Sequence, residues 1–185
     1  MSAFEGDYGF RTLEQPEGER ALRRFSSGWG AHARSVNSLV RQIYRGIAVP
    51  QPRVFVMEDI KEPSRPRTMG VCAWFTSPLG DDPDEAGSDS DHCLQVIGVS
   101  RRYRGQILAA GVTLGAALLG AALEQVQLEC AHIMPLVWAR VASDNYRSHV
   151  LFDSHDFEAF EGRGHTIRFR GGGLDPTPFP LKPER

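Results

Sequence analysis

The sequence predicts a mixed α/β (α+β) protein in which a central sheet carries helices on both faces. Short β-rich runs alternate with amphipathic helical patterns along the 185 residues, and no segment repeats another. The composition, 41% hydrophobic and 24% charged, is typical of a globular domain. A chain of this length buries a sizeable core. We therefore expect one domain over residues 1–170 and an irregular Gly/Pro-rich tail over residues 171–185.

The first part of the chain predicts one strand and two helices. Tyr8 to Leu13 is β-rich. Pro16 followed by GERALRRF indicates a helix, because proline is tolerated in a first turn and Leu22 and Phe25 lie three residues apart. After a glycine-rich break, apolar residues recur at helical spacing from Ala33 to Tyr44. We expect two amphipathic helices here.

The middle of the chain predicts three strands and an acidic loop. Arg53 to Asp59 and Met69 to Thr76 are β-rich, and the linker KEPSRPR is typical of a connection between antiparallel neighbours. The Gly/Pro/Ser-rich stretch from Asp81 to Asp91 holds six acids and cannot form a core. We expect it to be a loop that leads into a strand from Cys93 to Val99.

The last part of the chain predicts an apolar helix from Gly111 to Glu129 and a strand from Leu136 to Val141. Ser143 is suited to cap a short helix that reaches Ser154, with Asp144 in its first turn, where the helix dipole favours an anion. Two final strands bring the expected sheet to about seven: residues 157–160 and 166–169.

The segment from Ile107 to Leu123 contains no charge and has to be weighed as a membrane span. A span needs about 20 strongly apolar residues, whereas this segment is shorter and diluted by Ala, Gly and Thr. We therefore expect a buried helix and no membrane partner.

The charge balance and the cysteines restrict the remaining functions. Lys+Arg of 21 against Asp+Glu of 23 gives no overall basic field, so a nucleic-acid partner is not expected unless a local patch supplies one. Cys72, Cys93 and Cys130 are odd in number and widely spaced, which argues against a disulfide framework or a zinc site. Because the N-terminus also lacks the pattern of an export signal, we expect a cytoplasmic protein without a metal.

Two motifs point to a bound anion and an adjacent helix face. The strand ending at Val99 is followed by SRRYRGQ and an Ala/Gly-rich helix, so that helix-start amides, glycines and arginine charge would surround a phosphate. Taken alone, this segment is equally typical of a basic turn before a tightly packed helix. Forty residues later, Asn145, Ser148 and Phe152 share one face of the short helix.

Together the two motifs resemble those of the GCN5-related N-acetyltransferase (GNAT) family. The matching residues are Val99, Tyr103-Arg104-Gly105, Thr113-Leu114-Gly115, Asn145, Ser148, Leu151-Phe152 and Asp156-Phe157. The resemblance implies a mostly antiparallel sheet with one splayed parallel strand pair that holds acetyl-CoA. The cofactor residues that it implies are Val96, Ile97, Val99, Arg104, Gly105, Gln106, Gly111, Leu114, Gly115, Asn145, Ser148 and Phe152.

The sequence departs from the family pattern at three places. ILAAGV intervenes before Thr113, so the phosphates would meet either residues 106–109 or residues 111–115, and we prefer the second because it aligns Leu118 and Leu119 with the family's paired leucines. Phe152 replaces the tyrosine that protonates the leaving thiolate, which leaves water, Tyr146 or Tyr103 for that role. Asp156 replaces a glycine, and Asp tolerates a left-handed turn better than most residues.

The implied activity is transfer of an acetyl group from acetyl-CoA to a primary amine of a small molecule or peptide, by direct attack in a ternary complex. Candidate bases are Glu58, Asp59 and His92, because a base has to deprotonate the amine. The resemblance places the acceptor near Trp29, His32, Tyr44 and the acidic loop. The alternatives are a catalytically weak acyl-CoA-binding module and a toxin that acetylates aminoacyl-tRNA. A homodimer stays open.

Overall fold

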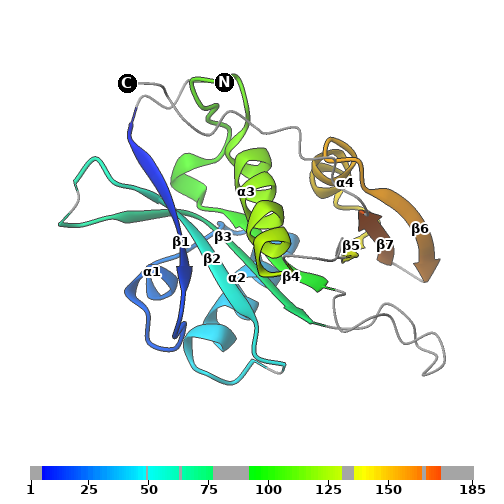
Figure 1. Ribbon diagram of the computed structural model, residues 1–185, viewed down its shortest axis with the longest axis horizontal. Helices are drawn as coiled ribbons and strands as arrows, with labels where there is room; N and C mark the ends of the chain where they lie inside the picture. The colour runs from blue at the N-terminus through cyan, green and yellow to red at the C-terminus, as the bar shows by residue number, and fades with distance from the viewer. Residues whose placement is uncertain are drawn as a thin grey trace.

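The computed structural model describes residues 6–48, 50–62, 64–76, 92–130, 136–163 and 166–171, with the backbone alone from residue 160 onward. Its seven strands form one sheet in the order β1-β2-β3-β4-β5-β7-β6 (Figure 1). Every neighbouring pair is antiparallel except β4 and β5. The strands are β1 (Tyr8–Leu13), β2 (Arg53–Asp59), β3 (Arg67–Thr76), β4 (His92–Val99), β5 (Val137–Ala142), β6 (Glu158–Arg163) and β7 (Thr166–Gly171). The predicted sheet is confirmed.

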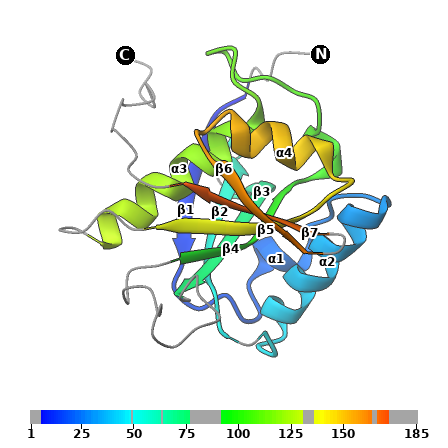
Figure 2. The ribbon, with the colours of Figure 1, turned by 90° about the vertical axis from the view of Figure 1, so that its right-hand side faces the viewer.

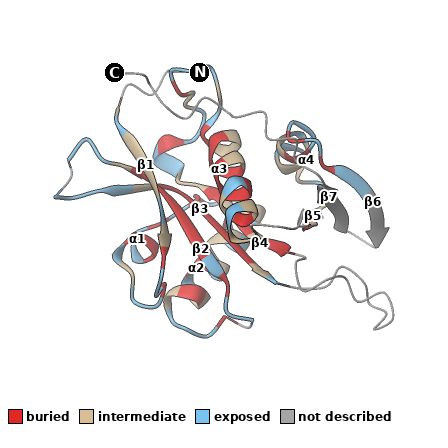
Figure 3. Ribbon diagram, viewed as in Figure 1, coloured by how far each residue is buried: buried red, intermediate tan, exposed pale blue. Residues whose placement is uncertain are grey.

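Helices cover both faces of the sheet and give the protein two cores. Helices α1 (Arg20–Arg23) and α2 (Ala31–Tyr44) pack on one face, where Val40 and Ile43 meet the inward valines of β2 and β3. Helix α3 (Leu114–Glu129) crosses the other face (Figure 1), where Leu118 lies in one cluster with Trp74. Helix α4 (Tyr146–Asp153) contributes Phe152 to that second cluster. The buried residues follow β2, β3 and the inner side of α3 (Figure 3).

The charge-free segment forms a buried helix only from Leu114 onward, so the helix predicted from Gly111 begins three residues later. Leu118, Leu119 and Leu123 of α3 are at most 2% exposed. In the part of the chain that the structure describes, no helix is long and apolar enough to cross a membrane.

The parallel pair β4 and β5 opens after a short paired stretch. Only His92 to Leu94 of β4 pair with Val137 to Ala139 of β5. A bulge follows at once, because Ala73 and Trp74 of β3 lie opposite Val96 and Leu94, so that Gln95 has no opposite residue. From Gln95 onward the described pairing of β4 is with β3 alone, and Figure 2 shows the two strands from the side of β5. The splayed pair implied by the resemblance is therefore present.

Several predicted boundaries were wrong for local reasons. Helix α1 is a single turn and does not begin at Pro16, because the amide of Gly18, whose φ is +73°, donates to the carbonyl of Tyr44. Ser143 does not cap α4 and Asp144 precedes its first turn. The amide of Asn145 donates to Ala142 O over 2.9 Å, and the amides of Ser148 and His149 donate to Asn145 O, which makes Asn145 the N-cap. The expected acidic loop and most of the expected tail lie outside the described residues.

Candidate active site

The turn after β4 is anchored to β2 by a buried tyrosine. This turn is a short 3-10 helix, η2 (Arg101–Tyr103), followed by Gly105 at φ +79°. Tyr103 is 4% exposed and its hydroxyl donates to Asp59 Oδ2 over 2.8 Å. Burial, and then the bond to Asp59, raise the pKa of Tyr103 to about 12. Tyr103 and Asp59, two of the predicted acid–base candidates, are therefore hydrogen-bonded to each other, and their bond anchors the turn.

The inserted ILAAGV forms a small hairpin that leaves the chain at Gln106 and returns at Thr113. Ile107 bridges to Thr113, Leu108 N donates to Val112 O, and Gly111 N donates to Leu108 O, the last two over 2.8 Å. Gly111 has a φ of +80° and is exposed at the tip of this hairpin. The insertion thus brings Thr113 directly after Gln106 in space. This geometry favours Leu114 and Gly115 at the expected anion position and separates Gly111 from them.

Helix α3 begins with amides that face outward along its axis. Thr113 is its N-cap, and the Thr113 hydroxyl accepts from Ala116 N over 3.2 Å. At Gly115 an added Cβ would lie 3.9 Å from Leu151 and Val99, an ordinary contact, so packing alone does not require glycine there. The first turn therefore presents positive dipole beside the end of β4, which suits an anion.

The arginines of the turn join it to the loop between α1 and α2. The guanidinium of Arg104 donates to the carbonyl of Ser27, and the amide of Arg101 donates to Ser26 O over 2.9 Å. The Arg101 side chain lies over Gly28, whose φ is +103°. The family resemblance assigned Arg104 to a phosphate, but its guanidinium already donates to a backbone carbonyl of the protein. The side chains of Arg101 and Arg102 are exposed.

Asn37 of α2 holds that loop in place. Ser27, which is 2% exposed, donates its amide to Asn37 Oδ1 over 2.8 Å, and Asn37 Nδ2 donates to Gly28 O over 3.0 Å. The loop presents Trp29, which is 78% exposed. Sequence reasoning missed Asn37, because a single polar residue in an amphipathic helix carries no signal of its tertiary partner.

The predicted face of α4 is divided between the surface and the core. Asn145 Nδ2 donates to Ser148 Oγ over 2.8 Å, and both side chains are half-buried. Phe152 is 2% exposed and packs against Phe157, with ring centroids 5.0 Å apart. Tyr146 is 74% exposed. The expected left-handed turn at Asp156 is present, with φ 56°.

His155 ties the end of α4 to the start of α3, a contact that no sequence pattern indicates. Its Nε2 lies 3.1 Å from Ala116 O, and its Nδ1 lies 3.0 Å from Leu151 O. The side chain is 7% exposed. The first turn of α3 and the helix that follows β5 are therefore held as one unit.

Glu58 and His92 have their own partners in the fold. Glu58 accepts from Arg11 Nε over 2.9 Å, an ion pair that raises the pKa of Arg11. His92 is 5% exposed, and its Nε2 lies 3.1 Å from Cys130 Sγ. The pKa of Cys130 is raised by burial and then by Glu129. His92 and Cys130 meet because the start of β4 lies beside the end of α3.

The predicted acceptor residues lie at two ends of α2. Trp29 precedes the helix, whereas Tyr44 is its last residue and packs against the α1–α2 core. His32, in the first turn, has its Nε2 3.5 Å from Asp144 Oδ1 in the loop after β5. Trp29 and His32 therefore lie beside the open strand pair, and Tyr44 does not.

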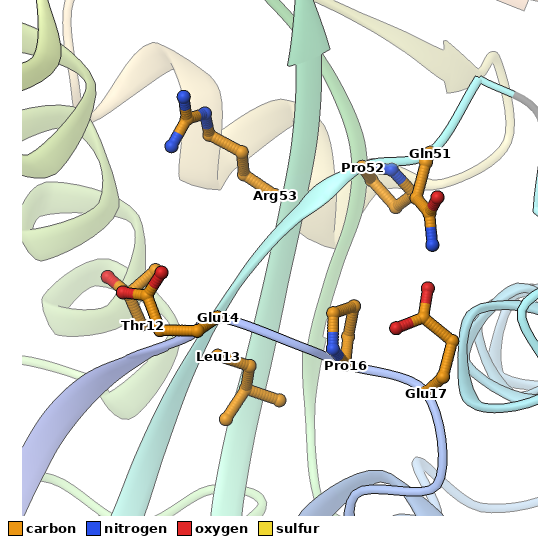
Figure 4. Close-up of a pocket in the computed structure, with 8 residues that line it drawn as sticks. All are labelled: Thr12, Leu13, Glu14, Pro16, Glu17, Gln51, Pro52 and Arg53. Carbon is orange, nitrogen blue, oxygen red and sulfur yellow. The ribbon is translucent and has the colours of Figure 1, made fainter.

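A hollow of about 310 Å³ lies elsewhere, where β1 ends and β2 begins (Figure 4). Glu14, Glu17 and Arg53 line it, and Arg53 reaches Glu129 at the far end of α3. It is therefore remote from the start of α3 and does not belong to the candidate site.

The open strand pair contains polar atoms suited to an acyl-CoA arm. The amide oxygens of Gln95 and Gln106 and the indole Nε1 of Trp74 are buried without a hydrogen-bond partner among the described residues. Gln95 occupies the bulge and Gln106 precedes α3. Pantetheine carries amide N–H and C=O groups, and buried polar atoms ordinarily have partners. The two glutamine acceptors therefore fit the amide N–H groups of acyl-CoA.

The sheet order, the splayed pair and the start of α3 beside it together define the GNAT fold. No protein-family model and no curated protein sequence matches the chain. Among solved structures, an acetyltransferase assigned to the GNAT family from Desulfovibrio desulfuricans is 16% identical with a TM-score of 0.57, over 90% of this chain and 99% of that one. At such identity the similarity establishes the fold.

Two other similar structures were solved as complexes with acetyl-CoA and with DNA. AtaTR bound with acetyl-CoA is 19% identical with a TM-score of 0.58, over 89% of this chain and 93% of that one. The KacTA–DNA complex is 10% identical with a TM-score of 0.62, over 90% of this chain and 93% of that one. AtaT has also been solved with acetyl-methionyl-tRNAfMet. These structures do not bear out our expectation against a nucleic-acid partner.

Proposed function

We propose that the protein is an acetyl-CoA-dependent N-acetyltransferase that acts in the cytoplasm on a primary amine. The observation that carries the proposal is the parallel pair β4–β5, which pairs for three residues and then opens beside the first turn of α3. An extended acyl-CoA fits this arrangement, because one end of the opening offers helix amides and the other offers unpaired strand backbone.

Each part of the opening has a role in holding acetyl-CoA. The first turn of α3, with Gly115, and the amide of Gly105 would bind the pyrophosphate. Ile97 and Val99 on β4 pack toward the α3 side and would line the pantetheine arm together with Asn145 and Ser148. The backbone amides near Val96 and Ile97 would polarise the thioester carbonyl. When bound, acetyl-CoA supplies a carbonyl carbon that accepts the amine lone pair and a thiolate that leaves.

The protein offers no hydroxyl at the position of the family's tyrosine. Phe152 lies in the core, so the departing thiolate takes its proton from solvent, or from Tyr146, which is 74% exposed on the same helix. This feature also supports a second candidate, a module that binds acyl-CoA and turns it over slowly.

A local basic surface supports an amine acceptor that is carried by RNA. Residues 20–48 and 100–106 contain nine arginines and no Asp or Glu. All nine are exposed: Arg20, Arg23, Arg24, Arg34, Arg41, Arg45, Arg101, Arg102 and Arg104. Arg34, Arg41 and Arg45 fall at i, i+7 and i+11 and so form one stripe along α2. The near-neutral net charge of the whole chain gives no sign of this patch. A cluster of exposed arginines is typical of a nucleic-acid-binding face.

The test is to incubate the protein with acetyl-CoA and either a panel of primary amines or aminoacylated tRNA, and to follow free thiol and acetylated product. Product that forms in proportion to thiol supports the transferase. Tight acetyl-CoA binding with slow hydrolysis and no product would instead support the module.

A further inference from the structure

An N-acetyltransferase needs a group that removes a proton from the acceptor amine, and the sequence-derived candidates are engaged elsewhere. Glu58 is paired with Arg11, Asp59 accepts from Tyr103, and His92 contacts Cys130. His92 also lies at the paired end of β4, three residues before the bulge. Ionisable groups at the open end of the strand pair are therefore the remaining candidates for the base.

His32 lies at that open end. Val36 rests on β4, because an added Cβ at Gly98 would lie 2.7 Å from Val36 Cγ1. His32 is four residues earlier on α2 and so projects from the same face, one turn further along. This places the imidazole beside the last residues of β4, on the face of the sheet opposite to α3.

Asp144 reaches His32 from the other strand of the pair. It stands two residues after Ala142, the last residue of β5, and its Oδ1 lies 3.5 Å from His32 Nε2. The contact thus spans from the helix over β4 to the loop after β5. The side chains are 40% and 78% exposed, so a substrate in solution can reach both.

We propose that His32 is the general base for the acceptor amine and that Asp144 is its positioning residue. Asp144 holds Nε2 as the protonated nitrogen, which leaves Nδ1 as the proton acceptor. The amine nitrogen forms the new C–N bond with the acetyl carbon, the C–S bond breaks with its electron pair on sulfur, and the amine proton passes to Nδ1 and then to water. The proposal rests on the proposed acetyl transfer.

Several charged groups lie on the elements that meet near His32. Asp144 and His149 belong to the β5–α4 side, Arg34 to α2 and Arg101 to η2. Histidine is the side chain that ordinarily changes charge between pH 5 and 8. A base of this kind therefore produces a rise of kcat/KM with pH in that range.

The test compares H32Q and D144N with D153N, which removes an exposed carboxylate from the opposite end of α4. The probe is acetyl-CoA with amino-acid amides, and the readouts are the pH profile of kcat/KM and the acetyl-CoA affinity. H32Q is expected to lose about 10²-fold in kcat/KM, since general bases contribute about 10²- to 10⁴-fold. It should also lose the rise of kcat/KM with pH between pH 5 and 8. The loss of kcat/KM should be smaller in D144N than in H32Q, and D153N should show no loss. The affinity for acetyl-CoA should stay within twofold in all three variants.

Two results would overturn the proposal, and they are distinguishable. If the wild-type protein transfers acetyl groups and H32Q does so with an unchanged rate and pH profile, His32 is not the base and the transferase stands. If the wild-type protein binds acetyl-CoA and acetylates neither an amine of the panel nor aminoacylated tRNA, the proposed function fails and the base fails with it.

Discussion

The amide of Ser27 donates to Asn37 Oδ1 over 2.8 Å, and this bond ties the loop beside the acceptor region to α2, next to the turn that would hold the cofactor phosphates. Ser27 also accepts from Arg104 of that turn. The two halves of the candidate site therefore share one rigid support. A change at Asn37 should affect both the fold and the use of the acceptor.

Replacement of Asn37 by Ala should lower the free energy of unfolding by about 2 kcal/mol, because it leaves the buried amide of Ser27 without its partner. The acceptor KM should rise more than the acetyl-CoA Kd, since the loop carries Trp29. Urea unfolding and steady-state kinetics measure the two effects. N37D keeps the acceptor oxygen and should lose less, and S38A, at an exposed position, is the control. Equal stability of N37A and S38A would contradict the role of Asn37.

Tyr103 should make stability fall at high pH. Below its ordinary pKa of 10 both states hold the phenol proton, whereas between pH 10 and about 12 the unfolded chain releases it and the folded chain keeps it. Each pH unit in that window therefore costs about 1.4 kcal/mol of stability. Y103F should flatten this part of the curve in urea unfolding between pH 9 and 12.

Cys72 adds a slope of the same sign, since burial raises its pKa to about 12. Y103F retains Cys72, so the difference between the two proteins isolates the phenol. Parallel stability curves for wild type and Y103F over this range would contradict the assignment.

Phe152 should act as a core residue and not as part of the chemistry. F152L keeps most of the buried volume and should lower the free energy of unfolding by about 1 kcal/mol, while the transfer rate per folded molecule stays within a few-fold. V150A changes an exposed residue of the same helix and is the control. A tenfold slower rate in F152L, with stability equal to that of V150A, would assign Phe152 to the active site.

The arginine stripe of α2 should bind the phosphates of RNA. R41Q/R45Q removes two charges at the end of α2 remote from His32, and K61Q/R65Q removes two exposed charges from the β2–β3 loop. Because each phosphate contact adds about 0.7 to 0.9 to the slope of log K against log salt, R41Q/R45Q should reduce the slope by about 1.5. Fluorescence anisotropy with tRNA measures this. An equal reduction in both double variants would mean that net charge alone matters.

Local patterns predicted the strands but not the partners that lie far apart in sequence. Strands β1 and β2 begin and end at the predicted residues, because β-rich runs bounded by polar turns identify their own limits. The contact of His92 with Cys130 and that of His32 with Asp144 join distant segments, so only the tertiary fold brings them together. The basic surface was hidden because a net charge reports a sum and not its distribution.

The most direct test of the cofactor site is thermal stabilisation by acetyl-CoA in the wild-type protein, G115V and G30A. Acetyl-CoA at about 100 times Kd should stabilise the wild type by roughly 2.7 kcal/mol. G115V should lose that stabilisation, because its larger side chain would cover the first-turn amides. G30A should keep it, since an added Cβ at Gly30 meets nothing within 4 Å. No shift in the wild-type protein at millimolar acetyl-CoA would contradict the acyl-CoA site.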